Sequence, residues 1–190
     1  MEVKQKILAF GHKSRVGKDT ITKFLLAVIN SRRPDLVAER RAFADKVKDI
    51  SYQLYKCHGL QPAQYYEEHP IARTIKLPTL GRDPVEIWVG VGDKLREVYA
   101  ETWVDLVLLD SSADIIIISD LRYPNEVARV HELGGVCVRL DKKDAPIRNT
   151  KADNALNDYT SWFRVVDNSG EEGALEQKAE ELLADLGWLK

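Results

Sequence analysis

The sequence lacks the features of exported, zinc-stabilised and disordered proteins. Its 190 residues include only two cysteines, Cys57 and Cys137, which lie far apart without zinc-ligand spacing. We therefore expect neither a disulfide framework nor structural zinc, and the reducing cytoplasm fits best. The 11 glycines and 7 prolines are too few for a collagen-like or low-complexity chain, so the sequence predicts a globular protein.

Long apolar runs and an excess of positive charge are also absent. No segment approaches the roughly 18 apolar residues of a membrane helix, and the stretch 7–10 is too short for a signal peptide. The 28 Lys and Arg residues face 30 Asp and Glu residues, a net charge of −2. We therefore expect no nucleic-acid or membrane partner. The length and the 44% apolar content predict a single domain, residues 1–190, with a large core.

Apolar periodicity predicts alternating strands and helices. The continuous aliphatic runs at 7–10 and 114–119 are typical of strands buried on both faces of a parallel sheet. Weaker strand patterns lie at 37–43, 136–140 and 163–166, and helical spacing lies at 18–30, 44–55, 84–109, 125–133 and 171–186. Glycines and prolines interrupt residues 58–82, which predicts an irregular insertion with at most one short helix. The alternation predicts a three-layer α/β fold, a parallel sheet of about five strands with helices on both faces.

The segment GHKSRVGKDT, from Gly11 to Thr20, lies between the first predicted strand and the first predicted helix, where a phosphate-binding P-loop belongs. Backbone N–H groups of such a loop and of the helix N-terminus point toward a polyphosphate. Lys18 would reach the β- and γ-phosphates, and the Thr20 hydroxyl would face Mg²⁺. The expected ATP-binding residues of this loop are Lys13, Ser14, Arg15, Val16, Gly17, Lys18, Asp19 and Thr20.

The loop departs from the standard pattern in two ways. Gly11 and Gly17 are separated by five residues rather than four, and Asp19 occupies the usual hydroxyl position. The alternative reading is an ordinary strand-to-helix turn with a solvated lysine. Asp19 either complements the positive end of the helix dipole or binds Mg²⁺ through water, and the sequence leaves both open.

A second group of candidates follows the Ile-rich strand. Asp120 stands at its C-terminal end, the edge at which ligands of open α/β sheets bind. Asp120 is therefore a candidate Mg²⁺ ligand, and Arg122 a candidate for a phosphate contact. The structural alternative is that Asp120 caps the following helix and Arg122 pairs with Glu126.

Four longer stretches share an order along the chain. They are the loop ending Gly17-Lys18-Asp19-Thr20, FADKVKDI at 43–50, VGVGDKLREVYAETWVDLVL at 89–108 and ISDLRYPNEVARVHELGG at 118–135, with VVDNSG at 165–170 as a weaker fifth. Together they resemble the deoxynucleoside monophosphate kinases of bacteriophages, a branch of the nucleoside monophosphate kinase-like P-loop proteins. The resemblance implies a P-loop NTPase fold in the host cytoplasm. It also implies transfer of the γ-phosphoryl group of ATP, with Mg²⁺, to a deoxynucleoside 5′-monophosphate.

The resemblance also implies roles for particular residues. The catalytic residues would be Lys18, Asp19, Arg122 and Arg148, the last in a lid at approximately 141–160, and Asn168 would join the ATP site. An acceptor-binding insertion would cover approximately 45–110. Its expected substrate-binding residues are Phe43, Asp45, Lys46, Arg73, Arg82, Trp88, Arg96 and Tyr99. For these arginines a surface ion pair, and for Trp88 and Tyr99 a place in the core, stay open as alternatives.

Two other functions stay open at this point. One is a P-loop kinase for another small acceptor, and the other is a non-catalytic nucleotide-sensing protein. Intact Lys18, Thr20 and Asp120 argue against a pure sensor, because binding alone needs no transition-state charge clamp. The sequence identifies no base and leaves open whether two copies form a homodimer.

Overall fold

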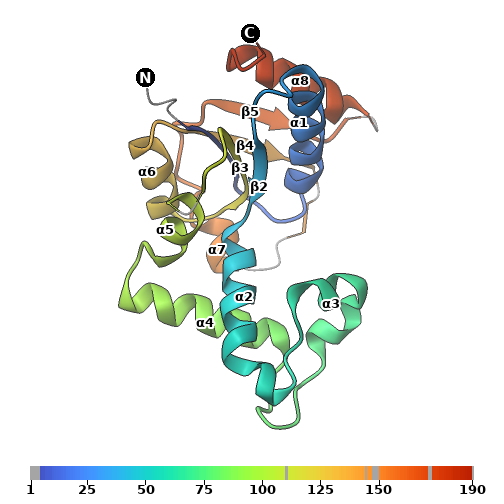
Figure 1. The fold of residues 1–190 in the computed structure, drawn as a ribbon, viewed down its shortest axis with the longest axis vertical. Coiled ribbons are helices and arrows are strands. Elements are labelled where there is room, and N and C mark those ends of the chain that lie inside the picture. Colours follow the sequence, from blue (N-terminus) through green and yellow to red (C-terminus); the bar gives the residue numbers. More distant parts are fainter. Residues whose placement is uncertain (1–4, 110, 144, 147–149, 171–172, 190) are drawn as a thin grey trace. The chain divides into compact units, whose positions relative to one another are not determined.

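The computed structural model of the chain, shown in Figure 1, describes residues 5–109, 111–143, 145–146, 150–170 and 173–189. Its contacts form two compact units. Met1–Ala42 and Ser111–Lys190 make the first, which we call the sheet unit, and Phe43–Asp110 makes the second, which we call the helical unit. The helical unit covers the segment for which an acceptor-binding insertion is predicted.

Five parallel strands form the sheet unit's centre. They are β1 (Lys6–Gly11), β2 (Ala38–Arg41), β3 (Ile115–Leu121), β4 (Val136–Asp141) and β5 (Arg164–Asp167), in the order β2-β3-β1-β4-β5. Leu8 pairs with both Ile117 of β3 and Val136 of β4, so β1 lies between them. The predicted parallel sheet of an α/β fold is confirmed, and each strand lies close to its predicted position.

Helices lie on both faces of this sheet. On one face α1 (Lys18–Arg32) and α8 (Ala174–Asp185) pack side by side, and Phe10 and Ile117 are fully buried beneath them. On the other face lies α6 (Pro124–Glu132), where a Cβ added to Gly135 would lie 2.7 Å from Ile7 Cβ and 2.8 Å from Val130 Cγ1. Because successive residues of a strand point to opposite faces, the inner strands β1 and β3 need continuous apolar runs, whereas the edge strands β2 and β5 carry charged residues.

The helical unit consists of short helices joined by turns. They are α2 (Phe43–Tyr55), η1 (Lys56–His58), α3 (Ala63–Glu68), η2 (Pro70–Thr74), α4 (Pro84–Val98) and α5 (Thr102–Leu108). α2 packs against α4 at Gly92, where a Cβ would lie 3.7 Å from Val47 of α2. The buried indole of Trp103 donates a hydrogen bond to the Gly92 carbonyl at 3.0 Å, which ties α5 to α4.

One predicted helix is in fact two. The spacing at 84–109 predicts a single helix, but the chain leaves the helical conformation at Tyr99, where φ is −152° and ψ is 114°. The Thr102 hydroxyl then donates to the Tyr99 carbonyl at 2.7 Å, and a new helix begins. A side chain that satisfies a backbone carbonyl at a helix end can break a helix without disturbing its apolar spacing.

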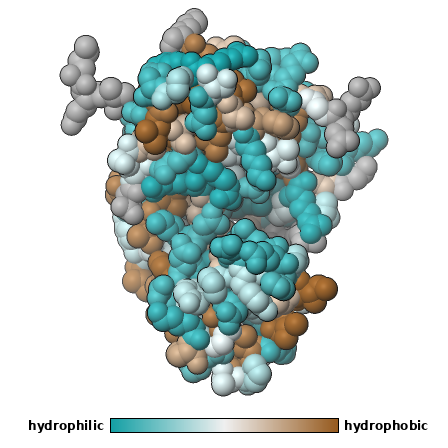
Figure 2. Space-filling view, turned by 45° about the vertical axis from the view of Figure 1, so that its right-hand side comes forward, coloured by the Kyte–Doolittle hydropathy of each residue, from teal (hydrophilic) through white to brown (hydrophobic). Residues whose placement is uncertain are grey.

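The hydropathy of the helices and of the surface can be compared with that of membrane proteins. In the ranges described above, no helix is long and apolar enough to cross a bilayer. Hydrophilic side chains cover most of the face drawn in Figure 2, and apolar ones are scattered among them. The most exposed large apolar side chains, Ile71 and Val98, both belong to the helical unit.

Candidate functional site

The loop between β1 and α1 has an unusual backbone. His12 and Arg15 have positive φ values of 83° and 57°, and Gly17 has a φ of 100°. Residues with a Cβ avoid this region, and each such residue costs on the order of 1–3 kcal/mol. The loop therefore needs surrounding contacts to hold it in this conformation.

Those contacts come from three other segments of the sheet unit, which follow β3, precede β5 and follow β5. His12 Nε2 lies 3.0 Å from Asn157 Oδ1, and the His12 carbonyl accepts a hydrogen bond from Arg122 Nη1 at 2.8 Å. Asn168, after β5, donates through Nδ2 to the Val16 carbonyl at 2.9 Å. Trp162 covers the start of the loop, because a Cβ added to Gly11 would lie 2.8 Å from its ring. The loop is thus fixed from several sides before any ligand binds.

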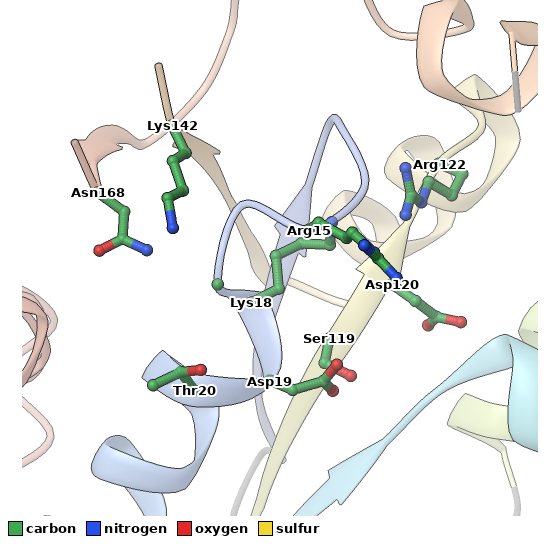
Figure 3. Close-up of a pocket in the computed structure, with 10 residues that line it drawn as sticks. Arg15, Lys18, Asp19, Thr20, Ser119, Asp120, Arg122, Lys142 and Asn168 are labelled. Atoms are coloured by element: carbon green, nitrogen blue, oxygen red, sulfur yellow. The ribbon is translucent and has the colours of Figure 1, made fainter. Parts of the chain in front are cut away.

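A polar cavity of about 410 Å³ opens beside this loop, as Figure 3 shows. Its lining comes from the loop, the first turn of α1 and the segments at the carboxyl ends of β3, β4 and β5. The lining residues are Arg15, Gly17, Lys18, Asp19, Thr20, Ser119, Asp120, Arg122, Lys142 and Asn168. The cavity therefore lies at the edge of the parallel sheet where α/β proteins bind ligands.

Lys18 is the central cation of this cavity. It is only 6% exposed, and its ammonium group donates to the Lys13 carbonyl. The pKa of Lys18 is lowered from 10.5 to about 8, first by burial and then by the positive charge of Arg122. The negative charges of Asp120, Asp153 and Asp19 raise this pKa and offset part of the effect. A buried ammonium group beside a second cation would gain from a bound anion. The solvated lysine of the alternative reading is therefore wrong, because Lys18 is buried.

Acidic and hydroxyl groups meet the cavity near the end of β3. Ser119 is 2% exposed and its Oγ has no hydrogen-bond partner among the described residues, while the neighbouring Asp120 is half-buried. In Figure 3 Asp19 lies between Thr20 and Ser119, and its carboxylate points toward Ser119. Asp19 also forms an ion pair with Arg40 at 3.1 Å.

These oxygen groups fit a hard divalent cation. Mg²⁺ prefers carboxylate and hydroxyl oxygens and is usually shared with substrate phosphates rather than enclosed by protein. The described residues contain no group of three or more His, Cys, Asp or Glu that could hold a metal by itself. A cation here would therefore draw its protein ligands from the oxygen-bearing residues of the lining, Asp19, Thr20, Ser119 and Asp120, and share them with phosphate oxygens.

The Arg122 guanidinium is held by hydrogen bonds to other segments of the chain rather than by the neighbouring helix α6. Its Nη1 donates to Asp153 and its Nη2 donates to Ser14 Oγ at 3.2 Å. Glu126 instead accepts from the backbone N–H groups of Arg122 and Tyr123, at 2.7 and 3.0 Å, and closes the start of α6. Tyr123 occupies the N-cap position. The N-cap of α6 is thus Tyr123 where the structural alternative expects Asp120, and the Arg122 guanidinium forms an ion pair with Asp153 where it expects Glu126.

Sequence reasoning missed three residues of this site, namely Ser119, Lys142 and Asp153. Asp153 lies on α7 (Thr150–Asn154), a helix that the sequence pattern did not predict, and it is only 1% exposed. Lys142 lines the cavity just after β4. A polar helix of five residues has no apolar periodicity that a sequence pattern could detect. Asp153 is recognised as part of the site only from its ion pair with Arg122 in the folded chain. Arg148, a predicted catalytic residue, lies outside the described residues.

The helical unit gathers several of the predicted acceptor residues around Trp88. Lys48 Nζ lies 5.8 Å from the centre of a Trp88 ring, and the Tyr66 ring meets Trp88 edge to face at 5.3 Å. Arg73 Nε donates to the Tyr66 carbonyl at 2.9 Å. Asp45 lies 3.6 Å from Lys48 Nζ. We call these five residues the Trp88 cluster.

Arg96 lies on the same face of α4 as Trp88, two turns later, and its Nη1 would be 3.5 Å from a Cβ on Gly92. The other predicted acceptor residues lie elsewhere. Phe43 is buried in the core, Lys46 is half-buried on α2, and the exposed Tyr99 donates to Asp105 Oδ2 at 3.0 Å.

Arg82 belongs to a different part of the helical unit. It lines a cavity of about 610 Å³ whose walls are mainly apolar, with Leu54, Tyr55 and Ile87 among them. Its Nη1 lies 3.8 Å from Glu86 Oε1. The structure therefore separates Arg82 from the Trp88 cluster.

Comparison with known proteins gives no further guide: no family model and no curated protein matches this chain.

Proposed function

We propose that this chain is an ATP-dependent kinase that transfers the γ-phosphoryl group of ATP to a deoxynucleoside 5′-monophosphate. The observation that carries the proposal is the placement of buried Lys18 beside Arg122, facing Asp120, in a polar cavity at the carboxyl edge of β1 and β3. The resemblance of the chain to the phage deoxynucleoside monophosphate kinases supports the choice of acceptor.

Phosphoryl transfer suits the groups in this cavity. An oxygen of the acceptor phosphate attacks the γ-phosphorus, the bond to the β,γ-bridging oxygen breaks, and ADP leaves with that electron pair. No protein nucleophile is needed, so catalysis depends on positioning and on neutralising charge. Lys18 and the loop N–H groups would bind the β- and γ-phosphates, and Arg122 would stabilise charge on the transferred group.

Two further parts complete the proposal. Mg²⁺ bound near Asp120, Ser119 and Thr20 would neutralise phosphate charge. The Trp88 cluster of the helical unit would bind the acceptor nucleotide, with Trp88 beside the base and Arg73 at the phosphate, and Arg96 farther along α4 would be a second cation.

An ADP-release assay tests the proposal. ATP and Mg²⁺ are supplied with each of dAMP, dGMP, dCMP and dTMP, their ribonucleotide counterparts and 5-modified pyrimidine monophosphates. We expect turnover with at least one deoxynucleotide, loss of turnover in Lys18→Met, and retained turnover in Lys23→Met, which removes an exposed lysine from the same helix. If ATP raises the melting temperature but no acceptor is phosphorylated, the chain is a nucleotide sensor or a kinase for another small acceptor.

A further inference from the structure

The sheet unit contains a buried carboxylate, that of Asp153, which has no direct role in the proposed reaction. Asp153 is 1% exposed, forms an ion pair with Arg122 and accepts a hydrogen bond from Ser14 Oγ at 2.9 Å. Taking a carboxylate out of water is costly, and a pair of buried ions rarely stabilises a fold more than apolar side chains would. A purely stabilising role therefore explains this residue poorly.

The partners of Asp153 are the ones that shape the site. Arg122 lines the cavity, and it also contacts Ser14 Oγ at 3.2 Å and the His12 carbonyl at 2.8 Å. His12 is one of the two loop residues with an unfavourable positive φ. One buried carboxylate thus fixes the direction of the arginine and, through the arginine and Ser14, the strained half of the loop.

We propose that Asp153 is a positioning residue, which orients Arg122 and the 12–14 part of the loop toward the phosphates. The expected effect of Asp153 on kcat rests on the proposed function. Its expected effect on anion affinity does not, because it concerns only how tightly the cavity binds a phosphate. Asp153 acts through Arg122 and Ser14 and does not itself touch substrate.

The charge of Asp153 makes the inference testable, because two effects oppose each other. A carboxylate close to an anion site repels the anion, so its removal should tighten binding if electrostatics alone mattered. If Asp153 instead positions Arg122, the change to asparagine frees the guanidinium to adopt other rotamers and weakens binding. The sign of the effect distinguishes the two.

The experiment uses the full chain and the variants Asp153→Asn, Arg122→Ala and the double variant, with Asp185→Asn as the matched control. Asp185 also pairs with an arginine, Arg164, but lies away from the cavity at the end of α8. Titration calorimetry measures the affinity for inorganic tripolyphosphate and for ATP, and the ADP-release assay measures kcat and KM. Thermal unfolding reports whether each variant is folded.

We expect Asp153→Asn to weaken tripolyphosphate binding at least fivefold, about 1 kcal/mol, and to lower kcat at least tenfold, with little change in the acceptor KM. In the Arg122→Ala background the same change should lower kcat by a smaller factor than in the wild-type background, since the part of its effect that passes through the arginine is then absent. Tighter anion binding in Asp153→Asn, or effects that multiply in the double variant, would overturn the inference.

Two outcomes separate this inference from the proposed function. If the wild-type chain binds ATP without turnover, the proposed function fails, and the affinity measurements still decide on Asp153. If Asp153→Asn does not fold, Arg122→Lys takes its place: a single ammonium group cannot reach Asp153, Ser14 and the His12 carbonyl at once. Tripolyphosphate affinity and kcat should then fall as they would in Asp153→Asn, and wild-type values would refute the inference.

Discussion

The replacement of Lys18 by methionine should make the protein more stable while it removes phosphate binding. The folded chain holds the Lys18 ammonium group in a buried position, and the pKa of this group falls from 10.5 to about 8. A shift of this size corresponds to about 3 kcal/mol of folding free energy lost at pH 7. Methionine keeps an apolar stem of similar length without the charge.

The expected gain is smaller than the whole electrostatic cost. Lys18→Met also loses the hydrogen bond to the Lys13 carbonyl, which contributes about 1 kcal/mol. The net stabilisation at pH 7 is therefore about 2 kcal/mol. For a chain of this size it raises the melting temperature by about 4–8 °C.

The pH dependence of the difference follows from the direction of the pKa shift. Below pH 8 both the folded and the unfolded chain carry the Lys18 proton, so the wild-type protein bears the full cost. Between pH 8 and 10.5 only the unfolded chain keeps it, and wild-type stability rises with pH relative to the variant. At pH 10 the stabilising effect of Lys18→Met should have almost disappeared.

Urea unfolding of both proteins at pH 7 and pH 10 measures this difference. The buffers must contain no phosphate, which would stabilise the wild-type protein by binding to it. Lys23→Met serves as the control, since Lys23 is exposed on the same helix. A variant less stable than wild type at pH 7, or a difference independent of pH, would refute the reasoning.

Two other substitutions give separate tests of the catalytic and the packing arguments. Arg122→Ala should lower kcat at least tenfold, which corresponds to about 1.4 kcal/mol of transition-state stabilisation. The control Arg32→Ala removes a half-exposed arginine and should leave the kinetics unchanged. Unaltered kinetics in Arg122→Ala would leave this arginine only a structural role. Gly135→Ala should cost about 1–3 kcal/mol in urea unfolding, because its Cβ would lie 2.7 Å from Ile7 Cβ. Gly90→Ala, in open space on α4, should instead stabilise by about 0.5–1 kcal/mol, and equal effects of the two would contradict the packing account.

The sheet could be predicted because its strands are buried on both faces. The run of four isoleucines from Ile115 to Ile118 has no polar residue to suit a solvated face, and all four are fully buried. The same reasoning placed Asp120 at the strand's carboxyl end, next to the loop. Short apolar runs bounded by polar residues thus sufficed to predict the position of the cavity.

The interactions inside the cavity could not be predicted in the same way. The Asp153 carboxylate meets Arg122 across 31 positions of the chain, and no local pattern predicts such a contact. The burial of Lys18 likewise depends on how the loop folds over it. At the break before Thr102 the hydroxyl and the backbone N–H of Thr102 both donate to the Tyr99 carbonyl, a local arrangement that leaves the apolar spacing unchanged.

The most direct test of the central claim follows the phosphoryl group itself. The protein is incubated with [γ-³²P]ATP, Mg²⁺ and an unlabelled deoxynucleoside monophosphate, and the products are separated by chromatography. We predict that the label appears in the deoxynucleoside diphosphate, one equivalent for each ADP formed, and that Lys18→Met gives no labelled product. Label found only in inorganic phosphate, or none released with any acceptor, would contradict the claim that this chain is a deoxynucleoside monophosphate kinase.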